Sequence, residues 1–162
     1  MFNFNIYNEA YAKIGNLTPI SADCGVLCSA RCCKGGEDAG MILFPGEEVF
    51  LKNKSFVKLT QRDMCGYRVW FAVCNGACPR ANRPLSCRIF PLSPRYEDGK
   101  LTIEFDPRAR TMCPLFGADA VEEKFTRAVN DVFVRLIASQ DVREMLDAYT
   151  KMQNEYRVFM PE

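Results

Sequence analysis

The chain has 162 residues, and its 21 Lys and Arg against 20 Asp and Glu give a formal net charge of +1. This balance gives no reason to expect nucleic acid or an anionic membrane as a partner. Hydrophobic residues make up 48% and charged residues 25%, which is typical of globular proteins and excludes disordered and fibrous classes. We expect a single domain over residues 1–162. No apolar run reaches the roughly 18 residues of a membrane span, and the first residues lack signal-peptide features, so the sequence predicts a cytoplasmic protein.

The first third of the chain predicts short helices around a loop rich in cysteine. Residues 8–14 have the apolar spacing of a short helix. Residues 16–40 hold four Cys among small residues and Gly, which is typical of a loop that carries metal ligands, with at most a turn of helix inside it. The Pro-Gly-Glu-Glu sequence at 45–48 predicts the start of a further short helix that continues to Leu51.

The middle of the chain predicts antiparallel strands. Residues 56–59 and 67–73 carry the β-branched and aromatic residues of paired strands, separated by more than a tight hairpin needs. Residues 101–105 alternate apolar and polar side chains, and Asp98-Gly99 before them is a strong hairpin signal, so residues 95–105 predict a β-hairpin.

Residues 117–159 predict a pair of helices that contains no Cys. The apolar period changes to that of a helix from Asp119 to Ile137, where Asp119 and Glu122 are spaced as a capping box. A second helix is expected over 140–156. The fold class predicted is therefore α+β, with a small antiparallel sheet and Cys-rich metal-binding loops over residues 16–116 packed on the C-terminal helical pair. This pair is expected to be core scaffold, and the alternative is that it binds a protein partner.

The chain contains nine Cys and no His. Without His, neither Cys-His dyads, Ser-His-Asp triads nor His-liganded metal sites are available. Cytosolic thiols stay reduced and nine cannot all pair, so metal or redox chemistry is favoured over disulfides. Nucleotide-binding Gly-rich fingerprints are missing as well, so we recognise no catalytic motif and make no assignment as an enzyme.

The spacing of the cysteines is Cys24-x3-Cys28-x3-Cys32-Cys33, then Cys65-x8-Cys74-x3-Cys78-x8-Cys87, then Cys113. Because no Cys-x2-Cys occurs, zinc ribbons and bacterial ferredoxins are disfavoured. The side chains of adjacent Cys32 and Cys33 diverge in regular structure. Both reach one mononuclear site only if the backbone is unusual, and a cluster or two nearby sites accommodate them more easily. We expect Cys65, isolated beside Gly66, to be a small buried residue.

These motifs resemble a cysteine-cluster family. The segment Cys78-PRAN-Arg83-Pro84-LS-Cys87-Arg88-IFP, the clustered Cys that end in a Cys-Cys pair, and the final Cys113-Pro114 are similar to the YkgJ-like CxxCxxCC family, a zinc- or iron-chelating domain. The first cluster departs from that family in having x3 gaps where its name has x2. The resemblance implies chelation by eight cysteines, and carried over position by position these are Cys24, Cys28, Cys32, Cys33, Cys74, Cys78, Cys87 and Cys113.

The segment around Cys87 also has a direct physical interpretation. Pro84 and Pro91 restrict the backbone on both sides of the thiol, which suits a ligand that must be held in place. Arg83 and Arg88 bracket Cys87 and could offset the negative charge of bound thiolates. The equal alternative is that both arginines pair with Asp or Glu at the surface.

Sulfur ligands favour zinc or an iron-sulfur cluster over Mg²⁺ or Ca²⁺. Eight thiolates could form two closed zinc sites, whereas the adjacent Cys pair favours iron-sulfur chemistry. The sequence therefore predicts a metal-binding protein with zinc or iron as cofactor, and the alternative is an iron-sulfur electron carrier or redox accessory protein.

Overall fold

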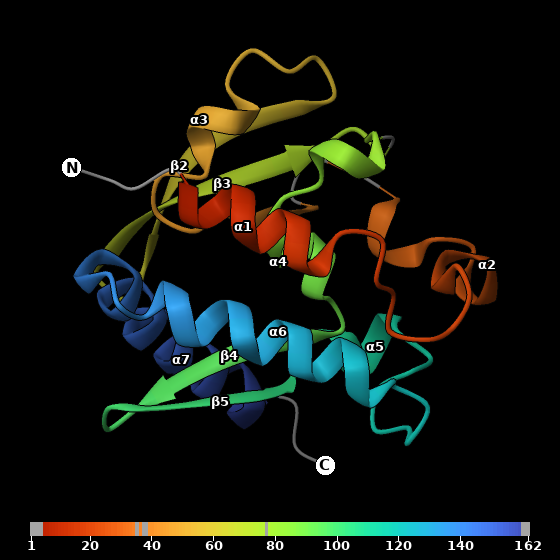
Figure 1. Cartoon of the computed structure of the whole chain (residues 1–162). Helices are drawn as coiled ribbons and strands as arrows, with labels where there is room; N and C mark the ends of the chain where they lie inside the picture. The colour runs from red at the N-terminus through yellow and green to blue at the C-terminus, as the bar shows by residue number, and fades with distance from the viewer. Residues whose placement is uncertain (1–4, 35, 37–38, 77, 160–162) are drawn as a thin grey trace.

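The computed structural model describes residues 5–34, 36, 39–76 and 78–159, and it has an α+β fold (Figure 1). The helices are α1 (Asn5–Ile14), α2 (Cys24–Cys28), α3 (Glu48–Leu51), α4 (Leu85–Ile89), α5 (Ala109–Met112), α6 (Glu123–Leu136) and α7 (Gln140–Phe159). Two 3-10 turns are η1 (Arg31–Cys33) and η2 (Arg80–Asn82). The strands are β1 (Gly40–Ile42), β2 (Val57–Met64), β3 (Tyr67–Cys74), β4 (Leu92–Glu97) and β5 (Lys100–Phe105). The predicted fold class is confirmed, with two small antiparallel sheets rather than one.

The first sheet has the strand order β1-β3-β2, and both pairings are antiparallel. The β2–β3 connection is tighter than expected, because β2 continues to Met64 and pairs it with Tyr67. Cys65 and Gly66 form the turn with φ of 50° and 84°, the left-handed conformation that a two-residue hairpin turn requires. Cys65 is therefore exposed at a hairpin tip, and the expectation that it is a buried core residue was wrong.

The second sheet is the predicted hairpin, formed by β4 and β5. Glu97 pairs with Lys100 across Asp98-Gly99, whose φ values are 51° and 75°. Both turn residues adopt the left-handed conformation that Asp and Gly tolerate best, which explains why this dipeptide predicted the hairpin.

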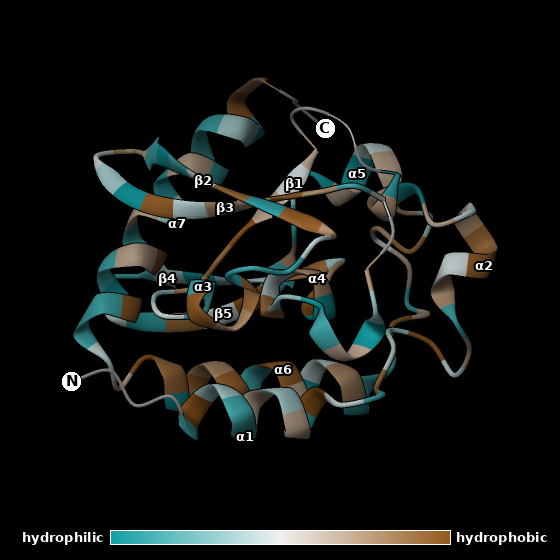
Figure 2. Cartoon of the chain, turned by 90° about the horizontal axis from the view of Figure 1, so that it is seen from above, coloured by the Kyte–Doolittle hydropathy of each residue, from teal (hydrophilic) through white to brown (hydrophobic). Residues whose placement is uncertain are grey.

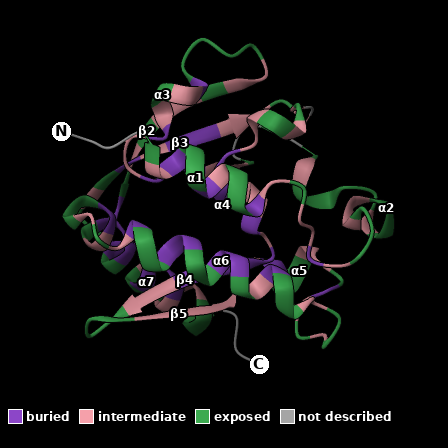
Figure 3. Ribbon diagram, in the orientation of Figure 1, coloured by how far each residue is buried: buried purple, intermediate pink, exposed green. Residues whose placement is uncertain are grey.

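The C-terminal helical pair packs on the strands, as predicted. One face of α6 buries Phe125, Val129 and Phe133, and this helix lies against α1 and β5. The apolar side of α6 faces the interior in Figure 2, and Figure 3 shows the same side as buried. α6 begins at Glu123 rather than at Asp119, so the predicted capping box is not formed. Among the described helices, none has both the length and the apolar character to cross a bilayer.

A buried polar network ties β5 to α7 through Asp106, which is 1% exposed. Its carboxylate accepts hydrogen bonds from Arg108 Nε at 2.8 Å and from the Tyr149 hydroxyl at 2.8 Å. Burial raises the pKa of Asp106, but its bonds and ion pair with Arg108 lower this pKa by more, so the group ionises below its ordinary range.

Replacing Asp106 with Asn is therefore expected to make the protein less stable at neutral pH by about 1 to 3 kcal/mol, because charged hydrogen bonds are lost. A carboxyl with a lowered folded pKa stabilises the fold above its unfolded pKa of about 4, and this contribution disappears as the pH falls through the folded pKa. Urea unfolding at pH 7 and pH 3 measures the gap between wild type and Asp106→Asn. A gap that is as large at pH 3 as at pH 7 would contradict this assignment.

Candidate metal centre

The eight predicted ligands span residues 24 to 113, yet they lie close enough for their charges to act on one another. They lie on α2 and η1, at the end of β3, in the segment before η2, on α4 and just after α5. Figures 1 and 2 both show α2 and α5 on the same side of the molecule, with α4 nearer its middle. All nine cysteines are free thiols. Cys65, which the sequence left out of the ligand set, lies at the opposite end of β3 from Cys74.

Backbone geometry between α2 and η1 brings Cys32 and Cys33 together. Ser29 and Ala30 are both left-handed, with φ of 52° and 51°, and they reverse the chain between the two short helices. The Sγ atoms of Cys32 and Cys33 are 3.9 Å apart. Two ligands of one tetrahedral zinc ion, with Zn–S bonds near 2.3 Å, have sulfurs about 3.8 Å apart. The two side chains therefore do not diverge, and their sulfurs lie as close together as ligands of neighbouring metal centres can.

Three thiols, those of Cys33, Cys78 and Cys87, interact with Arg83, and the charge of Cys74 acts on two of them. We call Cys33, Cys74, Cys78 and Cys87 the Cys87 group. Burial raises the pKa of the Cys87 thiol, and negative charge on Cys33, Cys78 and Cys74 raises it further. Burial also raises the pKa of Cys78, against the hydrogen bond and charge of Arg83, which lower it. The same arginine interacts electrostatically with Cys33 and Cys87. One cation therefore offsets negative charge on three of these thiols.

The other four thiols, Cys24, Cys28, Cys32 and Cys113, form what we call the Cys113 group. Burial raises the pKa of Cys24, and charges that include Cys113 and Cys28 add to this effect. Burial raises the pKa of Cys113, and negative charge on Cys28 raises it further. The pKa of Cys32 is raised by its hydrogen bond with Cys33, by burial, and by charge on Cys33, Cys28 and Cys24. The Cys32–Cys33 pair therefore joins the two groups.

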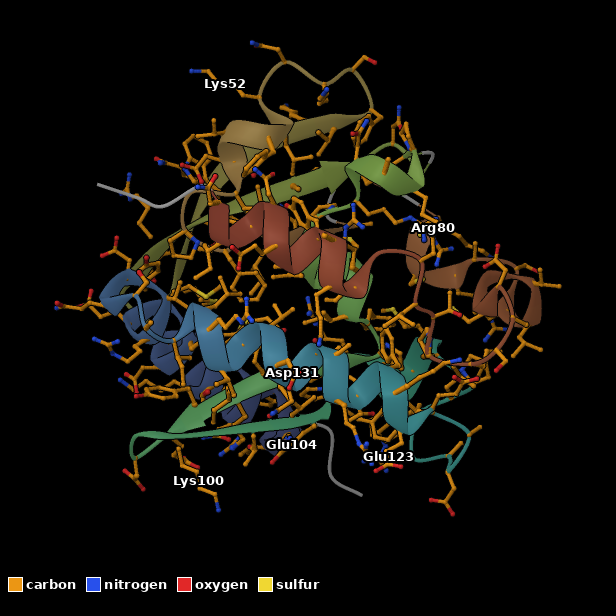
Figure 4. All side chains as sticks on the ribbon, viewed as in Figure 1. Lys52, Arg80, Lys100, Glu104, Glu123 and Asp131 are labelled. Carbon is orange, nitrogen blue, oxygen red and sulfur yellow. The ribbon has the colours of Figure 1, made fainter. Side chains whose placement is uncertain are left out.

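Each group has an arginine nearby. Arg80, labelled in Figure 4, lies on the side of the molecule where α2 is found, and its charge lowers the pKa of Cys24 against the larger effect of burial. The hydrogen bond with Cys32 lowers the pKa of Cys33 to about 6, and the charge of Arg83 acts in the same direction. One thiol of the adjacent pair is thus stabilised as a thiolate, the form that binds metals.

Arg88 has a different role from Arg83. Its Nε donates to the Arg83 carbonyl at 2.8 Å, and its terminal nitrogen donates to the Ala81 carbonyl at 2.7 Å. It therefore braces the turn that leads into α4. Of the two interpretations of these arginines, charge compensation fits Arg83, while Arg88 bonds to backbone rather than to a surface carboxylate.

Glu47 positions Cys87, and sequence reasoning placed it only in the first turn of a helix. The carboxylate is fully buried and accepts bonds from the backbone N–H groups of Leu85 and Phe44, at 2.5 and 3.1 Å, and from the Tyr11 hydroxyl. Burial raises its pKa to about 7 although these bonds lower it. Because α4 begins at Leu85, Glu47 fixes the start of the helix that carries Cys87.

The thiols match a metal centre in chemistry and charge, but they are not arranged as a finished coordination shell. Within the described part of the chain, no three Cys, Asp or Glu side chains are placed to hold an ion together. A rotamer change moves a Cys sulfur by about 3 Å, so rotations at neighbouring thiols would have to complete the shell. Arg83 Nε is buried with no hydrogen-bond partner among the described residues. A negatively charged metal–thiolate centre beside it would satisfy this donor.

Comparison of the chain with protein-family models, with curated proteins and with solved structures found no match. The resemblance to the cysteine-cluster family therefore rests on the motif residues alone.

Proposed function

We propose that this protein binds zinc or iron through two neighbouring groups of four cysteine thiolates. The observation that supports this most is that eight cysteines from distant parts of the sequence lie close enough for their charges to act on one another, whereas the ninth lies at the tip of the β2–β3 hairpin. Each member of a group interacts electrostatically with other members of that group. Membership of the YkgJ-like chelating family is part of the same proposal.

The Cys32–Cys33 distance bears on how the two groups are joined. The sulfurs of Cys32 and Cys33 are 3.9 Å apart although one thiol belongs to each group, so the two centres would be neighbours. Four thiolates in each group suit a closed zinc site. An iron-sulfur cluster with cysteine ligands, which would make the protein an electron carrier, is the alternative.

Protein purified without oxygen is expected to contain two metal centres, as two equivalents of zinc or as iron with sulfide. Elemental analysis read beside the visible spectrum separates the two chemistries. Zinc gives a colourless protein, whereas an iron-sulfur cluster gives broad absorption near ~400 nm together with acid-labile sulfide. A folded protein without metal, from cells supplied with zinc and iron, would contradict the proposal.

A further inference from the structure

The two cysteine groups differ in how firmly the fold holds them. Cys87 lies on α4, whose Leu85, Ser86 and Ile89 are buried. The Ser86 hydroxyl donates to the Ile42 carbonyl at 2.6 Å, so this helix is bonded to the end of β1 as well as to Glu47. The Cys87 group is therefore attached to the core of the protein.

The Cys113 group has a much weaker attachment. α2, which carries Cys24 and Cys28, contains no buried residue, and its Val26 and Leu27 are 79% and 61% exposed. Figure 3 shows this part of the chain as exposed or half-buried throughout. Cys32 is exposed too. Thiols on a peripheral segment of this kind can separate at lower cost than thiols on a core helix.

A pocket opens beside the same group. It has a volume of about 250 Å³ and lies between the α2–η1 segment and α5. Cys28 and Cys113 both line it, together with Arg31. A guanidinium group attracts carboxylates and other anions, so Arg31 suits the pocket to a small anionic ligand that approaches a metal held by Cys28 and Cys113.

We propose that the Cys113 group is an exchangeable metal site, which small anionic ligands load and unload through this pocket, while the Cys87 group keeps its ion. The inference rests on the proposed metal-binding function. It assigns two roles to the two groups: the core-attached one stabilises the fold, and the peripheral one gives up its metal to an incoming chelator. In exchange, each bond from the metal to a cysteine sulfur is replaced by a bond to a ligand oxygen, nitrogen or sulfur, and no oxidation is needed.

The test is metal release from zinc-loaded protein mixed with excess EDTA, a carboxylate chelator, followed over time in solution. Release is expected in two phases, with one ion leaving at least tenfold faster than the other. Cys113→Ser should remove the fast phase and leave the slow one. This variant keeps the Cys87 group, so it is expected to fold. The number of release phases in the wild-type protein already tests the proposal without any variant.

Substitution of Arg31 tests the route. Arg31→Gln should slow the fast phase several-fold, because the attraction for the anionic chelator is reduced. Arg68→Gln, near the far hairpin tip, should leave both rates unchanged. Two ions released together at one slow rate, or a fast phase that persists in Cys113→Ser, would overturn the exchange proposal alone. Protein that takes up no zinc at all would overturn the proposed metal binding and this inference with it.

Discussion

Cys87→Ser is expected to lose the metal of the Cys87 group and most of the protein's stability. The thiol lies on a helix fixed by Glu47 and Ser86, so the site cannot move to recruit a substitute ligand. Structural zinc is worth about 10 kcal/mol or more in zinc-finger peptides, and a domain is stable by only about 5 to 15 kcal/mol. The loss can therefore unfold the chain. Metal content and the thermal midpoint measure the effect.

Cys65→Ser is the matched control for this prediction. Cys65 is an exposed thiol at a hairpin tip, where substitutions usually change stability by less than about 0.5 kcal/mol. Its metal content should equal that of the wild type. Cys33→Ser should behave like Cys87→Ser, because both thiols belong to the same group. Equal and small effects at all three positions would show that the ligands are assigned wrongly.

Glu47→Ala is expected to destabilise the protein by about 3 to 5 kcal/mol. The change leaves the N–H groups of Phe44 and Leu85 and the Tyr11 hydroxyl without their acceptor, and each buried group that loses its partner costs about 1 to 3 kcal/mol. Metal binding by the Cys87 group should weaken with it, since α4 loses its N-terminal attachment. Urea unfolding and metal affinity of the same preparation measure both effects.

Glu47→Gln separates the loss of acceptors from the loss of volume. One side-chain oxygen accepts from Tyr11 and Leu85 and the other from Phe44, so either orientation of the amide sets its NH₂ against a donor. A loss of about 1 to 3 kcal/mol is expected. Glu123→Gln, at an exposed carboxylate paired with Arg127, should be close to neutral. Wild-type stability in Glu47→Gln would rule out the positioning role.

Periodicity predicted the parts of the fold in which local signals and packing agree. α7 and the Asp98-Gly99 hairpin follow from repeating patterns and turn chemistry. The start of α6 was predicted wrongly because Asp119 is a residue type that often caps helices. The N-cap is instead Glu122, whose carboxylate accepts a hydrogen bond from Ser21. Such a contact, between residues far apart in sequence, has no local signature. A partner for the C-terminal helices stays a prediction.

The eight candidate ligands could be chosen from the sequence. Their division into the Cys87 group and the Cys113 group could not. Spacing separated Cys65 from the other eight, but it could not place Cys32 with Cys28 and Cys33 with Cys87, because this depends on two left-handed residues, Ser29 and Ala30. Neither is a glycine, so the sequence gives no hint of the reversal. Glu47 was missed as a positioning residue because two of its partners, Tyr11 on α1 and Leu85 on α4, are far from it in sequence.

Native mass spectrometry of anaerobically purified protein, in wild type and in Cys113→Ser, tests the central claim of two separate thiolate centres most directly. The account predicts two metal ions, or their iron-sulfur equivalents, in the wild type and one in Cys113→Ser, with Cys65→Ser identical to the wild type. A wild-type mass without metal, or a Cys113→Ser variant that keeps both ions, would contradict it.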